Sequence, residues 1–385
     1  MKKLIKLKSK ISYGKHYIDK NDNTSVVKSL NSGVLSGGKN IIFFEKKIKE
    51  YLKSKYALAC SSGTAALHLA FLSLNLKKND VVILPVINFV AAANILSLMN
   101  INFFFADVDK ETGQITEKTF KECLKKNNIK KVKVLLTSYM GGNIYNYQHI
   151  INLKNKYGFL LLEDACHALG SQYKIKNKYY KIGSCKHADI ATFSFHPLKT
   201  ITTGEGGLVT TNKNHIYKKI KLLRSHGFNY QKKYWNYNLE FSGLNYRMSD
   251  INAALGFSQL KKIASFLKKR YSIAYRYNKG LKNLKYVSLP ELQKYSSWHL
   301  YIIKIDFKKI KISRNYLIKK LNSINIFPQI HYTPNTNFKK FNKLNKYQFK
   351  NAKKYYESCL SLPIYFKYSK KNQEIVIKNL INILS

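Results

Sequence analysis

The feature that most constrains the fold is a series of short, continuous apolar runs that alternate with helix-like segments between about residues 57 and 212. Strands that are buried on both faces read as continuous apolar runs rather than as alternating apolar and polar residues. Such strands, separated by helices, predict an α/β fold with a mostly parallel central sheet sandwiched by helices. The runs lie at residues 81–84, 102–106, 132–136, 159–162, 188–193 and 207–210.

The pattern changes beyond about residue 285, where strand-like runs such as residues 298–305 mix with helical segments. A chain of 385 residues is also too long for one small core. We therefore expect an N-terminal arm with a short helix (1–40), a large domain (41–250) and a linking helix with a smaller α+β domain (251–385). Ser249 followed by Asp250 predicts the start of that long helix, because both residue types favour a helix N-terminus.

The formal net charge of +48 raises the question of nucleic acid binding. The basic residues are overwhelmingly lysines that are spread along the chain, whereas base recognition favours arginine for its paired donors. We therefore expect an enzyme with a lysine-rich surface and no nucleic acid partner. The charge would still help to attract an anionic substrate such as a nucleotide.

The cysteines and the apolar segments predict where the protein works. The five cysteines form no Cys-x-x-Cys pair and are odd in number, which fits free thiols in a reducing compartment. No run of 18 apolar residues is present, and the basic start of the chain is not followed by an apolar stretch. We expect a cytoplasmic protein with no membrane span, no export signal and no metal site.

A first candidate site is the segment Ser62-Gly63-Thr64, which precedes a helical stripe that includes Leu67 and Ala70. The N–H groups at the start of a helix are free to bind an anion, and the helix dipole adds to the attraction. The segment is a candidate phosphate site. The alternative is an ordinary helix cap that binds nothing.

A second candidate is Asp164, which follows the apolar run at residues 159–162. A carboxylate at the end of a buried strand is costly unless it is paired. A protonated ring nitrogen would be such a partner, and Asp164 would then keep that ring an electron sink. His167 lies within reach of the same ring. The alternative is that Asp164 caps the next helix.

The third candidate is Lys199, in a turn that Pro197 stiffens and that leads into the glycine-rich segment 203–207. A lysine in a confined site can lose its proton and act as an amine nucleophile. In a chain so rich in lysine, a solvated surface residue is the default alternative. The neighbouring turn and the two upstream candidates favour a catalytic Lys199.

Together these segments resemble the DegT/DnrJ/EryC1/StrS family of sugar aminotransferases. The resemblance implies the fold-type I architecture and pyridoxal 5′-phosphate as cofactor. The matching segments occur in the family's order and span most of the chain, at residues 62–66, 85–94, 163–168, 194–199, 203–207, 224–227 and 243–249.

The resemblance also implies roles for individual residues. Lys199 would hold the cofactor covalently and later move a proton. Asp164 would pair with the ring nitrogen, and His167 would lie near the ring hydroxyl. Phe89 would stack on the ring face.

The remaining cofactor contacts implied by the resemblance surround the phosphate. Gly63, Thr64 and Ser194 would hold it from the same subunit. The family works as homodimers, so Asn245 and Arg247 would reach the phosphate region of the partner subunit's site.

The substrates follow from the same resemblance, with L-glutamate as amino donor and a nucleotide-linked ketosugar as acceptor. Segments 194–199, 252–260, 297–301 and 329–334 are similar to aminotransferases of pseudaminic acid biosynthesis. This similarity implies a UDP-linked 4-keto-6-deoxy N-acetylated hexose that is aminated at C4. Alternatives are a dTDP- or GDP-linked ketosugar, a related sugar dehydratase, which would carry histidine in place of Lys199, and a basic binding protein without activity.

Several side chains could contact the sugar nucleotide: His196, Trp298, His299, His331 and Tyr332. Stacking and hydrogen bonding suit these residue types. The alternative for Trp298 and Tyr332 is that they fill the core of the small domain. The loops at residues 35–39 and 335–337 are also expected to approach the substrate.

Other residues in the motifs are expected to be structural. Glu205 lies between glycines and would shape a turn. Arg224 and His226 would fix a loop, and Cys60 and Cys166 would pack beside the site without chemistry.

Overall fold

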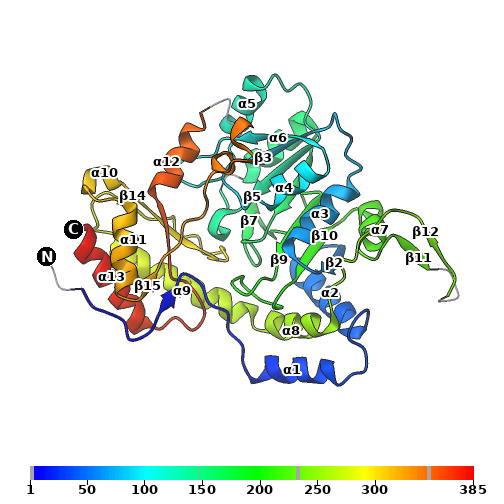
Figure 1. The fold of residues 1–385 in the computed structure, drawn as a ribbon, viewed down its shortest axis with the longest axis horizontal. Coiled ribbons are helices and arrows are strands. Elements are labelled where there is room, and N and C mark those ends of the chain that lie inside the picture. The colour runs from blue at the N-terminus through cyan, green and yellow to red at the C-terminus, as the bar shows by residue number, and fades with distance from the viewer. Residues whose placement is uncertain (1–3, 146, 231–234, 345–347) are drawn as a thin grey trace.

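The computed structural model describes residues 4–145, 147–230, 235–344 and 348–385. Its centre is a seven-stranded sheet with the strand order β2-β10-β9-β6-β5-β3-β4 (Figure 1). β10 runs antiparallel to both of its neighbours and the other pairs are parallel. The expected mostly parallel sheet is therefore confirmed. The strands are β2 (Tyr56–Cys60), β3 (Val81–Pro85), β4 (Asn102–Ala106), β5 (Val134–Ser138), β6 (Leu160–Asp164), β9 (Ile190–Ser194) and β10 (Gly207–Thr211).

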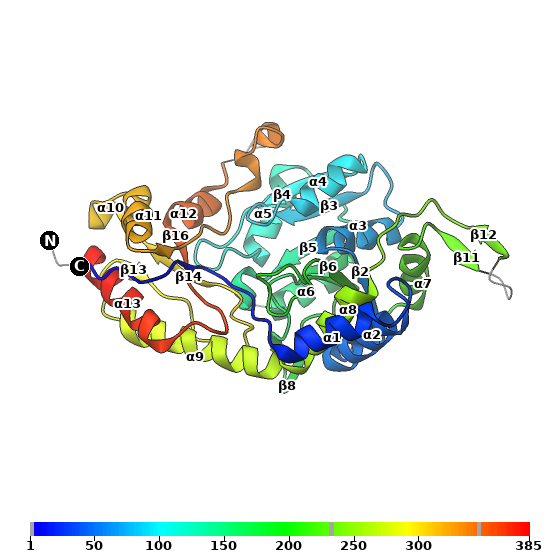
Figure 2. The same cartoon turned by 60° about the horizontal axis from the view of Figure 1, so that its bottom comes forward.

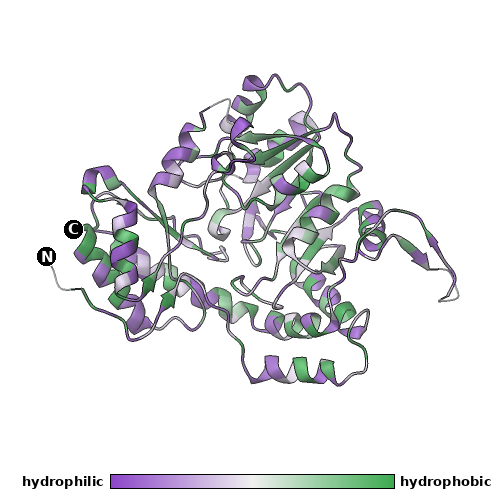
Figure 3. Ribbon diagram, viewed as in Figure 1, coloured by the Kyte–Doolittle hydropathy of each residue, from purple (hydrophilic) through white to green (hydrophobic). Residues whose placement is uncertain are grey.

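Helices cover both faces of this sheet, because successive strand residues point to opposite sides. In β5, Val134 and Leu136 pack in one core with α3 (Gly63–Ser73), α4 (Ala91–Leu98) and α7 (Asn214–Leu223). Leu135 packs on the other face with α5 (Glu117–Lys126) and α6 (Tyr147–Tyr157). On that second face α2 (Lys39–Leu52) and α8 (Asp250–Lys261) cover the β2 side. Figure 3 shows mainly apolar residues in the central strands and polar ones on outer helices such as α12 (Lys350–Ser358).

A second core lies in the C-terminal part of the chain, around a three-stranded antiparallel sheet of β13 (Val287–Ser288), β14 (Tyr301–Ile305) and β16 (Cys359–Leu362). Leu7 and Ile11 belong to this core, and β1 (Ile11–Ser12) pairs with β15 (Ile326–Phe327). Residues 7–12 thus pack on the small C-terminal unit. Its helices are α9 (Ile263–Leu281), α10 (Phe307–Ile310), α11 (Arg314–Ser323) and α13 (Lys370–Leu384), whereas Ala352 and Tyr355 of α12 pack in a core of the large sheet.

The single long helix expected from Ser249 is instead two helices, α8 and α9, that meet at Lys262 (Figure 2). Lys262 ends one helix and begins the other, and its ammonium group forms ion pairs with Asp19 and Asp22 at the start of α1 (Lys20–Leu30). α8 packs against α1 and α2, whereas α9 carries core residues of the small unit. The domain limits 1–40, 41–250 and 251–385 stay our proposal, with the joint at Lys262 as its physical landmark.

Two hairpins complete the described chain. β7 (Gln172–Ile175) and β8 (Lys178–Lys181) pair beside the large sheet, and β11 (Phe228–Tyr230) and β12 (Tyr237–Leu239) form a hairpin that projects from the body in both views (Figures 1 and 2). Among the described residues, no helix is both long enough and apolar enough to span a membrane.

Candidate active site

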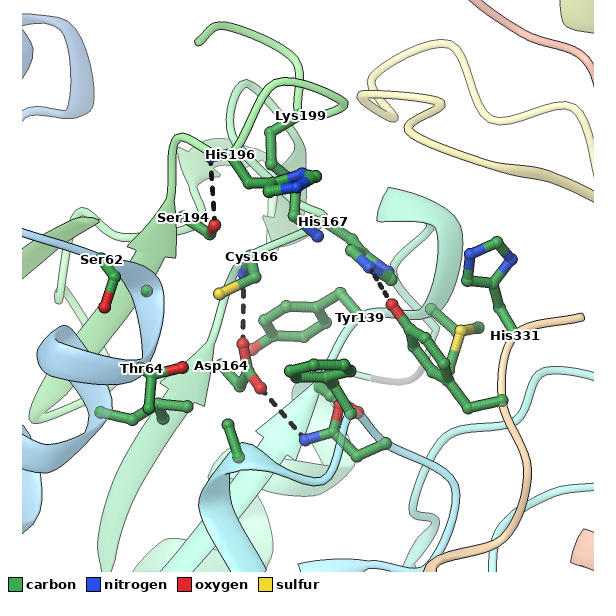
Figure 4. Close-up of a pocket in the computed structure, with 18 of the residues that line it drawn as sticks. Ser62, Thr64, Tyr139, Asp164, Cys166, His167, Ser194, His196, Lys199 and His331 are labelled. Carbon is green, nitrogen blue, oxygen red and sulfur yellow. Dashed lines mark hydrogen bonds between the residues drawn. The ribbon is translucent and has the colours of Figure 1, made fainter. Parts of the chain in front are cut away.

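The parallel strands bring their carboxyl ends to one edge of the sheet, where ligands of open α/β sheets bind. A cavity of about 500 Å³ lies there. Asp164 ends β6 opposite Ser138 of β5, and Ser194 ends β9 opposite Gly207 of β10. The cavity is lined by ten of the residues expected from the sequence, namely Gly63, Thr64, Phe89, Asp164, His167, Ser194, His196, Lys199, His331 and Tyr332 (Figure 4).

The start of α3 forms one end of the cavity. Ser62 has an extended backbone, and its hydroxyl accepts a hydrogen bond from Ala65 N at 3.0 Å, so the helix begins at Gly63. The first N–H groups of a helix have no acceptor within it, which leaves those of Gly63 and Thr64 for an anion. A Cβ on Gly63 would lie 2.7 Å from Ser194 Cβ, so glycine is required for β9 to come this close. Ser194 and the helix start thus face the same anion position.

Asp164 lies at the other end, with 6% of its surface exposed. Its Oδ1 accepts from Cys166 N at 3.3 Å and its Oδ2 accepts from Asn88 Nδ2 at 3.1 Å. No ion pair to Asp164 occurs within the described ranges. The alternative that Asp164 caps a helix is wrong, because turns follow β6 until β7 begins. A buried carboxylate with amide donors alone calls for a cationic partner.

Lys199 lies in the turn after β9, where its backbone N–H donates to His196 O at 2.9 Å. Its side chain reaches into the cavity between Cys166 and His167 (Figure 4). Burial lowers the pKa of Lys199 below that of a surface lysine, while the Cys166 thiol and the Asp164 carboxylate oppose the shift. A larger fraction of this amine is therefore neutral and nucleophilic at a given pH.

His167 links the part of the cavity near Lys199 to the segment that carries Tyr332. A hydrogen bond of 2.9 Å links His167 Nε2 to the Tyr332 hydroxyl. Burial, and then the electrostatic influence of neighbouring Lys199 and His331, lower the pKa of His167 well below its ordinary value. His167 is thus a neutral hydrogen-bonding group beside Lys199.

His331 and Tyr332 form the wall opposite Lys199. Ser361 Oγ lies 2.8 Å from His331 Nδ1, and burial followed by the charge of Lys199 lowers the pKa of His331 to about 3. The ring of Tyr13 packs against His331 with centroids 5.0 Å apart. This wall is therefore polar but uncharged.

Two expectations for the substrate side are wrong. Trp298 is fully buried in the small core, where its indole N–H donates to Gln293 O at 3.0 Å, so it cannot stack on a sugar nucleotide. His299 does not line the cavity and instead packs its ring on His167, with centroids 4.4 Å apart. The loops at residues 35–39 and 335–337 also lie outside the lining of this cavity.

Asn245 and Arg247 do not line the cavity of their own chain. They follow the projecting hairpin, where Asn245 bridges Ser225 and where Tyr246 O accepts from Ser61 N at 2.9 Å. Their expected role on a partner subunit stays a prediction. Arg224 does fix this loop, as expected, through an ion pair with Glu45 and a bond to Ala59 O.

The cavity also contains residues that the sequence argument missed or assigned elsewhere. Tyr13 carried no signal, because it lies in a short segment without a motif, and Gln329 lay in the matching segment 329–334 but had no assigned role. Asn88 was visible beside Phe89 but had no assigned role. Glu205 and Cys166, expected to be structural, line the wall, and burial together with the Asp164 carboxylate raises the pKa of the Cys166 thiol well above its usual range.

These features fit one kind of cofactor. A phosphate suits the start of α3, a protonated ring nitrogen suits Asp164, and an aldehyde suits the amine of Lys199. The ring of Phe89 is exposed and lines the same cavity, where an aromatic side chain can stack on a flat ring. On a mostly parallel sheet with a second small unit, this arrangement defines a pyridoxal-phosphate-dependent aminotransferase of fold type I.

Comparisons with known proteins agree. The chain belongs to the DegT/DnrJ/EryC1/StrS aminotransferase family, whose model matches residues 16–381. It is 37% identical over 377 residues to the UDP-4-amino-4,6-dideoxy-N-acetyl-beta-L-altrosamine transaminase of Campylobacter jejuni subsp. jejuni serotype O:23/36, covering 97% of both chains. The Helicobacter pylori transaminase of the same name is 33% identical, with 91% of this chain and 92% of that one covered.

A solved structure shows the same fold. Helicobacter pylori PseC, an aminotransferase involved in the biosynthesis of pseudoaminic acid, superposes with a TM-score of 0.91 at 30% identity, covering 98% of this chain and 99% of that one. The predictions of family, fold type, enzyme class and cofactor are confirmed. Within the described part of the chain, no group of three or more His, Cys, Asp or Glu side chains could hold a metal ion.

Proposed function

We propose that the protein transfers an amino group from L-glutamate to the C4 ketone of UDP-2-acetamido-2,6-dideoxy-β-L-arabino-hexos-4-ulose, a step of pseudaminic acid biosynthesis. The observation that carries the proposal is the 37% identity to the Campylobacter jejuni transaminase across 97% of both chains. The same fold across nearly the whole of Helicobacter pylori PseC supports it. The five free thiols suit work in the reducing cytoplasm.

The site residues would divide the chemistry as follows. When bound, pyridoxal phosphate supplies an electron sink for negative charge at the donor Cα. Lys199 would hold the cofactor covalently and, once freed by the donor, move the proton from that Cα. Asp164 would keep the ring nitrogen protonated. The N–H groups of Gly63 and Thr64 would hold the phosphate, with the hydroxyl of Ser194.

The sugar would lie against the wall formed by His331 and Tyr332, with exposed His196 at the rim. Because His331 is uncharged, this wall can exchange hydrogen bonds with hydroxyl and carbonyl groups without attracting the carboxylates of the donor. The hydrogen bond between Tyr332 and His167 would tie sugar binding to the cofactor side.

We further propose a homodimer with shared active sites. Apolar side chains that are about half exposed or more gather at the start of α2 and before it: Val34, Leu35, Ile42 and Phe43. Leu35 O accepts from Asp250 N at 2.9 Å, which places this patch beside the loop that carries Asn245 and Arg247. A contiguous apolar patch favours a protein partner. A second copy that covers it would receive Asn245 and Arg247 near its phosphate site.

The substrate proposal is tested by a coupled assay with UDP-N-acetylglucosamine, a 4,6-dehydratase that also inverts C5, this protein and glutamate. A new amino sugar with nitrogen at C4 by NMR is the expected product. Amination of a dTDP- or GDP-ketosugar without turnover of the UDP compound would contradict the substrate and leave the enzyme class intact.

A further inference from the structure

The carboxylate of Asp164 is held by a side chain to which the chemistry above gives no role. Asn88 lies in the turn between β3 and α4, and its Nδ2 donates to Asp164 Oδ2 at 3.1 Å. Both residues are buried and both line the cavity. With Cys166 N on the other oxygen, amide donors from two separate segments fix the direction in which the carboxylate faces.

Asn88 is in turn held by Asn335. The backbone N–H of Asn335 donates to Val86 O at 2.8 Å, and its Nδ2 donates to Val86 O at 3.2 Å and to Asn88 O at 3.1 Å. Asn335 is only 1% exposed, so water does not compete for these bonds. It follows Tyr332 by three residues, and it therefore docks the segment of the substrate wall onto the turn that carries Asn88.

The hydrogen bonds to the Asp164 carboxylate have an electrostatic effect. Hydrogen bonds from amides to a carboxylate favour its charged form, and they do so more strongly in a buried site than in water. A carboxylate that must balance a protonated ring nitrogen has to be charged and aimed at that nitrogen. Asn88 supplies a side-chain amide donor to Asp164, beside the Cys166 thiol, which also forms a side-chain hydrogen bond with this carboxylate.

We propose that Asn88 and Asn335 form a positioning relay for Asp164. Asn88 orients and stabilises the charged carboxylate, and Asn335 fixes Asn88 and couples it to the segment of His331 and Tyr332. Neither residue touches the reacting atoms. The inference rests on the proposed role of Asp164 at the ring nitrogen.

The test measures the affinity of the apo-protein for pyridoxal phosphate, the pH dependence of the visible absorption of the bound cofactor, and the melting temperature of the apo-protein. Asn88→Ala is expected to weaken binding about 10-fold, the scale of one hydrogen bond to a charged group, and to shift the pH midpoint. Asn88→Asp, of the same size, is expected to weaken it further, because it sets a second carboxylate against Asp164.

The matched control is Asn379→Ala. Asn379 is fully buried, and its side-chain amide bonds the backbone of Ile5, far along the chain from the cavity residues. The control should lower the melting temperature and leave affinity and absorption unchanged. Wild-type affinity and pH midpoint in Asn88→Ala overturn the relay. If that variant does not fold, Asn88→Asp with wild-type values overturns it equally.

The Asn335 step has its own test. Asn335→Ala should weaken cofactor binding, and the double variant with Asn88→Ala should lose less than the product of the two single losses, because both act through one contact. If the two losses of affinity combine in full in the double variant, the proposed link between Asn335 and Asn88 is wrong. Asp164→Asn distinguishes a failure of the relay from a failure of the role proposed for Asp164. If this variant leaves cofactor affinity and absorption unchanged, the role of Asp164 at the ring nitrogen is wrong. If it changes them but the Asn88 variants do not, only the relay is wrong.

Discussion

Three buried histidines should make the folded chain sensitive to acid. His167, His299 and His331 are each less than one-tenth exposed, and burial is the first cause that lowers the pKa of each. In the unfolded chain a histidine takes up its proton near pH 6.5. Below that pH the unfolded chain therefore binds more protons than the folded chain, so the free energy of unfolding falls as the pH falls.

The magnitude follows from the linkage relation. For a histidine with an unfolded pKa of about 6.5 that stays neutral in the folded chain, the change from pH 7 to pH 5 removes about 2 kcal/mol. His331, whose pKa burial lowers to about 3, fits this case, and the shifts of His167 and His299 in the same direction add to the loss, against a whole stability of about 5–15 kcal/mol for many domains. The fold should therefore be strongly weakened at pH 5.

The substitution His299→Phe isolates the contribution of one of these three histidines. The charged or titratable groups that face His299 are His167, Lys199, Arg270 and His331. Its Nδ1 has no hydrogen-bond partner among the described residues, and a phenyl ring preserves the packing on His167. Between pH 7 and pH 5, the free energy of unfolding of the variant should fall by about 2 kcal/mol less than that of the wild type.

The assay is urea unfolding of the apo-protein at both pH values, at one protein concentration and with the denaturant slope unchanged. His215→Phe is the control, because His215 is exposed in the folded chain and its replacement should leave the pH dependence as in wild type. An equal loss of stability in His299→Phe and wild type would refute the reasoning.

Three predictions concern the catalytic groups. Borohydride reduction and peptide mapping should place the cofactor on Lys199, and a label on another lysine would contradict the assignment; Lys199→Ala should lose turnover. Asp164→Asn should lower turnover about 100-fold or more, the scale of one buried electrostatic group, and near-normal turnover would show that its charge is dispensable. Mixing Lys199→Ala subunits with an Asn245/Arg247 double variant should restore about a quarter of wild-type activity, since half of the randomly mixed dimers carry one intact site; mixed dimers that stay inactive would rule out sharing.

Local signals in the sequence were sufficient for the sheet and for the groups that sit at strand ends. Six of the seven strands of the central sheet were visible as apolar runs, because burial on both faces leaves little choice of residue, whereas β2 was not among the predicted runs. Asp164 and Lys199 stood out for a related reason. A carboxylate directly after a buried strand and a lysine in a stiffened turn conflict with the usual preference of these residues for water.

The residues that the sequence did not place depend on packing between distant segments. Nothing near Trp298 distinguishes an aromatic that fills a core from one that contacts substrate, and only the small core decides that it is buried. Tyr13 reaches the cavity because β1 pairs with β15, more than 300 residues away along the chain. The ion pairs of Lys262 at the joint are with Asp19 and Asp22 at the start of α1, more than 200 residues away along the chain.

Asp164 could be found from the sequence, whereas the residues that hold its side chain could not. The position of Asp164 at a strand end is a local property that the apolar run reveals. Its hydrogen bond to Asn88, and the bonds from Asn335 to the turn that carries Asn88, join three segments that come together only in the folded chain. Sequence periodicity reports which face of an element is buried, whereas hydrogen bonds between elements depend on how those elements are placed in space, and only the tertiary structure fixes that placement.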